Sequence, residues 1–132
     1  MDKFITLLYK KYQNAILEDW GAYCSDDYKK YAAYVKKQFK ASAESRGFTL
    51  KRFSVNHYDF SGFFEKNGKF IYFSSNQQRY EQPLDLTTTG AMNGILYRTA
   101  EHDRDFRGGS NNFTSIVDLL DDVERMFANI AA

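Results

Sequence analysis

The chain has 132 residues, of which 43% are hydrophobic and 27% charged, and its formal net charge is +1. This length and composition fit a soluble globular chain that buries a core without a structural metal or a disulfide framework. The single cysteine, Cys24, excludes an internal disulfide and is typical of a reducing compartment. Because residues 1–10 are too short and too charged for a signal peptide or a membrane span, we expect a cytoplasmic protein outside the membrane.

Two helices are predicted first along the chain. The first has apolar residues at helical spacing over residues 4–16 and ends near Trp20. The second begins at residues 25–27, where Asp26 and Asp27 suit the positive end of the helix dipole, and it ends at Arg46 and Gly47. The residues at its predicted apolar face are Tyr28, Tyr31, Ala32, Val35, Phe39 and Ala43.

Strands are predicted from Phe48 onward, because the apolar residues then alternate instead of recurring at helical spacing. A slip in the alternation at Lys51 and Arg52 predicts a β-bulge. Asn-Gly at 67–68 separates two apolar runs and supplies the positive φ angles of a type I′ turn, which predicts a hairpin. The polar residues 74–93 predict a long irregular connection, and residues 95–97 predict a further strand.

The last helix is predicted to begin near Thr114, with Thr114 or Ser115 as its cap. Its apolar face comprises Ile116, Leu119, Leu120, Val123, Phe127 and Ile130. We therefore predict a single α+β domain over residues 1–132. It would have two N-terminal helices, a three- to four-stranded antiparallel sheet with the Asn-Gly hairpin, and a C-terminal helix packed on the sheet.

Residues 101–112, here called the 101–112 loop, connect the last predicted strand to the last helix and are the main candidate for a binding site. The loop combines alternating charges with a glycine pair, and loops held between ordered elements commonly carry function. Arginine and aromatic residues anchor many protein interfaces, and aromatics make up 17% of this chain. We predict that exposed tyrosines take part and that the partner-binding residues are Tyr97, Arg98, Arg104, Phe106 and Arg107.

Catalysis and metal binding are less well supported. Gly108 and Gly109 precede a helix, but no phosphate-loop lysine and no G-x-G-x-x-G spacing accompanies them. His102 lies among acids whose side chains point in different directions, so they do not converge on one substrate. His57, His102 and Cys24 lack the spacing of metal ligands. We expect no catalytic residue, no metal and no cofactor, and an enzyme is the third hypothesis.

Charge is distributed unevenly along the chain. Residues 1–52 carry eleven Lys and Arg against six Asp and Glu, whereas residues 114–132 carry four acids and one arginine. Opposite the apolar face of the second helix lies a basic stripe of Lys29, Lys30, Lys36, Lys37 and Lys40. Such a stripe can follow a phosphate backbone, and it is also common on the solvent side of a helix. Nucleic-acid binding through these lysines is therefore the alternative function.

The function predicted from these patterns is that of a small non-enzymatic protein-binding module, of inhibitor or adaptor type. No motif of a known family can be placed on the residues; the small size and the ten tyrosines are typical of accessory proteins of phages and mobile elements. The expected partner is another protein, whose identity stays open. A homodimer is a further alternative, because uncovered sheet edges invite pairing.

Overall fold

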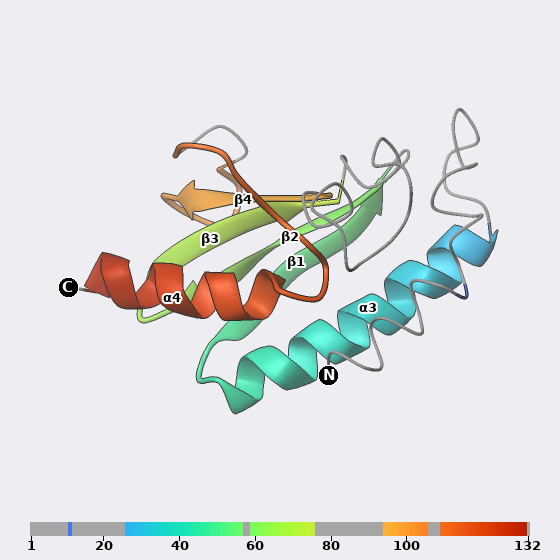
Figure 1. Cartoon of the computed structure of the whole chain (residues 1–132), viewed down its shortest axis with the longest axis horizontal. Helices are drawn as coiled ribbons and strands as arrows, with labels where there is room; N and C mark the ends of the chain where they lie inside the picture. The colour runs from blue at the N-terminus through green and yellow to red at the C-terminus, as the bar shows by residue number, and fades with distance from the viewer. Residues whose placement is uncertain (1–10, 12–25, 57–58, 76–93, 106–108, 132) are drawn as a thin grey trace.

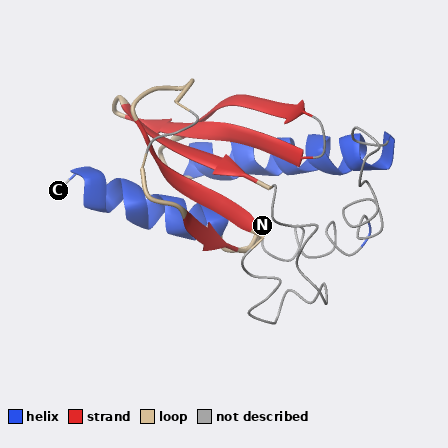
Figure 2. Ribbon diagram, turned by 90° about the horizontal axis from the view of Figure 1, so that it is seen from above, coloured by secondary structure: helices blue, strands red, loops and turns tan. Residues whose placement is uncertain are grey.

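The computed structural model describes residue 11 and residues 26–56, 59–75, 94–105 and 109–131. Its elements in chain order are α3 (Asp26–Ser45), β1 (Thr49–Asn56), β2 (Asp59–Lys66), β3 (Lys69–Ser74), β4 (Ile95–Ala100), β5 (Asn112–Thr114) and α4 (Leu119–Ala131). The five strands form one antiparallel sheet in the order β1-β2-β3-β4-β5. Both helices lie on the same face of this sheet (Figures 1 and 2), so the predicted α+β class is confirmed.

Two details of the predicted fold need correction. The sheet has five strands where three to four were predicted, because residues 112–114 form the short strand β5. The last helix begins at Leu119 and not near Thr114, since β5 and a turn over residues 116–118 precede it. Apart from residue 11, the first predicted helix lies outside the described residues, as do Cys24, His57 and most of the irregular connection (residues 76–93).

Helix α3 supplies one side of the hydrophobic core, and the predicted apolar face is confirmed. All six residues of that face are at most 2% exposed. The ring of Phe39 lies between three rings of the sheet, with centroids 5.6 Å from Phe73, 6.1 Å from Phe64 and 6.3 Å from Phe60. Aromatic pairs in such tilted or edge-to-face arrangements contribute about 0.5–1.5 kcal/mol each beyond their buried area. The core between α3 and the central strands is therefore mainly aromatic.

The end of α3 sets the position of the sheet relative to the helix. The N–H of Gly47 donates to Glu44 O (3.2 Å) and the N–H of Phe48 to Ala43 O (3.0 Å), the hydrogen-bond pattern of a Schellman motif. The turn places the ring of Phe48 5.3 Å from that of Phe127 in α4. The predicted stop at Arg46 and Gly47 is confirmed, and it joins both helices to one core.

The predicted bulge and hairpin are also confirmed. The pairing of β1 with β2 shifts between Lys51 and Ser54, and Arg52 has a φ of 52°. Asn67 and Gly68 have φ angles of 52° and 80°, as a type I′ turn requires. Lys51 and Arg52 are exposed on β1, an edge of the sheet among the described strands. A bulge with two exposed cations opposes the pairing of two copies through that edge.

The start of α4 is held by two hydroxyl side chains. Ser115 Oγ accepts a hydrogen bond from the N–H of Asp118 (3.0 Å), and the hydroxyl of Thr114 is hydrogen-bonded to the carboxylate of Asp122. The residues of α4 and the preceding turn that are buried in the core are Ile116, Leu119, Leu120, Val123 and Phe127. As predicted, this helix packs on the sheet.

Removing the Ser115 hydroxyl tests this account of how α4 begins. Ser115→Ala is expected to lower the free energy of unfolding by about 1 kcal/mol, because the N–H of Asp118 loses its side-chain acceptor. Urea denaturation measures the change. Ser110→Ala is the control, because Ser110 is exposed and is expected to change the stability by less than about 0.5 kcal/mol. Equal effects of the two substitutions would contradict a capping role.

Candidate functional site

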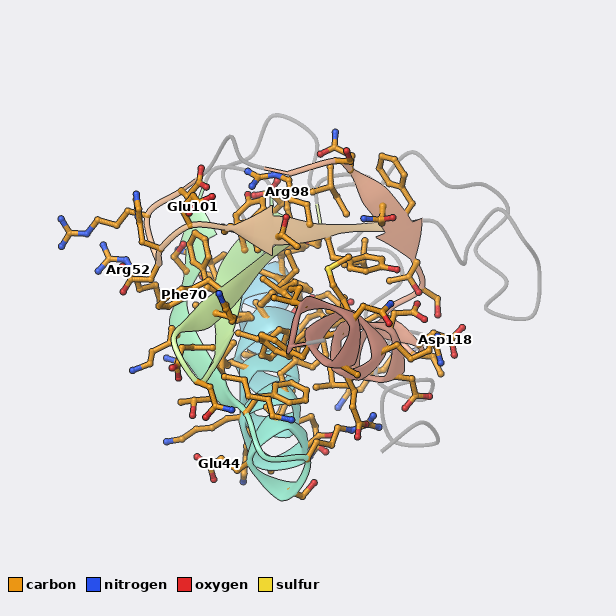
Figure 3. All side chains as sticks on the ribbon, turned by 90° about the vertical axis from the view of Figure 1, so that its left-hand side faces the viewer. Glu44, Arg52, Phe70, Arg98, Glu101 and Asp118 are labelled. Carbon is orange, nitrogen blue, oxygen red and sulfur yellow. The ribbon has the colours of Figure 1, made fainter. Side chains whose placement is uncertain are left out.

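The face of the sheet turned away from the helices, here called the outer face, carries a row of three side chains across neighbouring strands. Phe63 pairs with Tyr72, and Tyr72 pairs with Arg98, in the registers of β2, β3 and β4. The rings of Phe63 and Tyr72 are 5.2 Å apart, and Cζ of Arg98 lies 4.5 Å from the Tyr72 centroid. Figure 3 shows Arg98 on the side of β4 away from α4. A cation–π contact of this kind contributes about 2 kcal/mol when it is desolvated.

Arg98 is buried and positions the chain that follows β4. It is only 4% exposed, and its Nη1 donates to the backbone oxygen of Asp105 at 3.4 Å. A buried guanidinium must find such partners, since losing water without replacement is costly. Tyr97 lies on the opposite face of β4, half-buried against the core. The two adjacent residues predicted as contacts therefore belong to different faces of the sheet, and neither presents its side chain fully to solvent.

The described start of the 101–112 loop is ordered by its own hydrogen bonds. The N–H of Glu101 donates to Asp105 Oδ2 at 2.9 Å, and the N–H of Asp105 donates to His102 O at 3.2 Å. The N–H of Arg104 donates to His102 Nδ1 at 3.1 Å. The hydrogen bond between Asp105 and Glu101 closes this turn. The hydrogen bond from Arg98 to Asp105 connects the turn to the sheet. These hydrogen bonds order residues 101–105, although Glu101, His102 and Arg104 are exposed.

The described start of the loop and strand β5 offer an exposed cation and an exposed aromatic ring. Arg104 is exposed, and Phe113 on β5 is 46% exposed. Phe113 pairs with Leu96 of β4. The loop begins after Ala100, which is four residues, or about 13 Å along an extended strand, from Leu96. The strand position beside Phe113 and the start of the loop are therefore close enough to belong to one interface patch of standard size, about 800 Å² per partner. Phe106 and Arg107 lie outside the described residues.

Phe113 is a surface residue that sequence reasoning did not select. The segment Asn-Phe-Thr was interpreted as the end of a loop and the start of a helix. A strand of three residues is too short to show alternation, so the only available signal was one aromatic residue among polar ones.

The five lysines of α3 that were predicted to bind nucleic acid are all exposed, so they form a basic surface on this helix. The ion pairs of the described residues involve other cations: Arg46 Nη1 lies 2.6 Å from Asp121 and 2.9 Å from Glu124, and Arg125 pairs with Asp122. Burial acts to lower the pKa of Arg46, but the hydrogen bonds and charges of Asp121 and Glu124 outweigh it and raise that pKa above its ordinary value. The paired acids of α4 are thus partly neutralised, whereas the α3 lysines take part in none of these ion pairs.

The described residues show little that points to chemistry. Within them, no three His, Cys, Asp or Glu side chains gather closely enough to hold a metal ion. His102 is exposed, and its Nδ1 already accepts the hydrogen bond from Arg104.

Comparison with known proteins adds no relative: no family model, no curated protein and no solved structure matches the chain. Neither of the two long helices in the described ranges has the length and apolar character needed to cross a membrane.

Proposed function

We propose that this chain is a small non-enzymatic protein-binding module that contacts another protein through the 101–112 loop and strand β5. The proposal is carried by the turn of residues 101–105, which is hydrogen-bonded internally and to buried Arg98 and includes exposed Arg104, together with exposed Phe113 on β5. A fixed loop loses little conformational entropy on binding, so more of the contact energy contributes to affinity. Arginine and aromatic side chains are enriched in such interfaces.

The roles of the arginines differ in this proposal. Arg98 is a positioning residue, because its guanidinium is buried over Tyr72 and reaches the backbone of the loop. Arg104 and Phe113 are the contact residues in this proposal, because both are exposed. The role that we propose for such a surface is that of an inhibitor or an adaptor.

The double variant Arg104→Ala/Phe113→Ala tests the proposal. Central interface residues of this type contribute at least about 2 kcal/mol, so we expect affinity to fall by about 30-fold or more. The immobilised native chain is first used to capture its partner from a lysate of the source cells. Calorimetry with that partner then gives the affinity of each variant.

A matched control removes one exposed cation and one exposed aromatic ring elsewhere. Lys69 lies beside the hairpin turn and Tyr34 on α3, and both are exposed. Lys69→Ala/Tyr34→Ala is expected to bind the partner as the native chain does. Undiminished binding by Arg104→Ala/Phe113→Ala, with its fold intact by circular dichroism, would exclude this surface as the interface.

A further inference from the structure

The solvent side of α3 carries a strong positive charge. Residues 28–43 contain five lysines and no acid, while Asp26, Asp27 and Glu44 flank them. From Lys29 to Lys40 the stripe extends about 16 Å along the helix axis, at about 1.5 Å per residue. The ion pairs described for this protein leave these lysines out and use Arg46 and Arg125. Five like charges on one surface create a field that attracts a polyanion.

An exposed aromatic ring lies at one edge of this basic surface, beside Lys30 and Lys37. Tyr34 is 45% exposed, one of two large hydrophobic side chains exposed to this degree in the described part of the chain. It follows Lys30 by four residues and precedes Lys37 by three, the spacings at which side chains on a helix are neighbours. The ring is therefore flanked by cations on both sides along the helix.

We propose that the solvent face of α3 binds single-stranded nucleic acid, with the lysines on phosphates and Tyr34 stacked on a base. Proteins that bind single strands without sequence preference combine a basic track with aromatic rings, since every base has a face for stacking. The lysines complement the charge of the backbone, and Tyr34 supplies the stacking surface.

Other polyanions fit this surface less well. A duplex keeps its bases stacked on one another, so Tyr34 would have no base face to contact, and α3 presents none of the arginines that read guanine in the major groove. Acidic protein surfaces and planar carboxylates are usually met by arginine forks, whereas this face has only lysine. The combination of lysine and tyrosine therefore favours a single strand.

This activity is independent of the protein-binding function proposed above. α3 packs on the face of the sheet opposite the Phe63–Tyr72–Arg98 row, and the lysines point away from the core. A nucleic acid on α3 and a protein on the 101–112 loop would contact different surfaces, so each set of variants tests one function alone.

Fluorescence anisotropy with labelled oligo-dT and oligo-U of about 15 nucleotides, near the upper site size of single-strand binding folds, tests the inference. The native chain is expected to bind both at low salt, more tightly than a duplex of equal length, and to lose affinity as salt rises. Lys29→Gln/Lys36→Gln/Lys40→Gln is expected to weaken binding at least tenfold. It should also reduce the slope of log K against log salt by about 2, because each lost contact with a single strand contributes about 0.7.

Three controls make the result specific. Lys51→Gln/Lys66→Gln/Lys69→Gln removes the same charge from the sheet and is expected to bind nearly as the native chain does. Tyr34→Ala is expected to weaken binding about tenfold, whereas Tyr34→Phe retains it because the ring remains. No binding at low salt, equal effects of the two lysine triples, or tighter binding of the duplex would each overturn the proposal. Unchanged binding by Tyr34→Ala would overturn the stacking role and with it the preference for single strands.

Discussion

Phe39→Ala is expected to lower the free energy of unfolding by about 3–5 kcal/mol, the largest effect of any single substitution considered for this protein. Phe39 is fully buried, and its ring is in contact with those of Phe60, Phe64 and Phe73. Alanine would leave a cavity between α3 and strands β2 and β3. The surrounding rings are rigid and already in contact with one another, so they can fill little of that space.

Urea denaturation followed by circular dichroism measures the loss. Tyr34→Ala on the same helix is the control, because it removes an aromatic ring of similar size from an exposed position. Its effect on stability is expected to stay within about 1 kcal/mol. A loss below about 1 kcal/mol for Phe39→Ala would mean that the aromatic cluster does not dominate the core.

Gly109→Ala is expected to lower the free energy of unfolding by at least about 2 kcal/mol and to release the 101–112 loop. Gly109 has a φ of 71°, and a Cβ at this position would lie 2.6 Å from the carbonyl oxygen of Thr99. Both the left-handed backbone and this close approach to β4 favour glycine. The loop must move away from β4 to accept a methyl group, which would displace Arg104 from its position.

Gly68→Ala is the control that separates the effect of the left-handed backbone from the effect of the close contact with Thr99. Gly68 also has a positive φ, 80°, but a Cβ there would meet nothing within 4 Å. Its substitution is expected to cost about 1 kcal/mol through the backbone alone. Gly109→Ala should in addition speed the exchange of the Glu101 amide, which is hydrogen-bonded to Asp105, and weaken partner binding. If Gly109→Ala and Gly68→Ala lower the stability equally and leave the exchange of the Glu101 amide unchanged, the close approach of Gly109 to Thr99 does not position the loop.

The features that could be predicted from the sequence are those encoded locally. The buried face of α3 follows from a helical period over twenty residues, and all six predicted residues are buried. The hairpin follows from Asn67 and Gly68, whose backbone preferences determine the turn without help from the rest of the chain. The bulge at Arg52 was visible as a slip in the alternation.

The features that could not be predicted depend on contacts between distant segments. In β4, Leu96 and Arg98 alternate with Ile95 and Tyr97, so apolar residues occur on both faces and the sequence does not say which one the helices cover. The burial of Arg98 depends on Tyr72 from another strand and on a loop carbonyl. Thr114 and Ser115 both resemble helix caps, but Thr114 is used in β5 and bonds to Asp122.

Binding of a partner protein through the 101–112 loop and β5 is tested most directly by hydrogen exchange measured by mass spectrometry. The native chain is compared alone and in complex with its captured protein partner. We expect slower exchange on binding at residues 101–105 and 109–114, with no change along α3. Protection confined to α3 or α4, with the loop unaffected, would contradict the proposed interface.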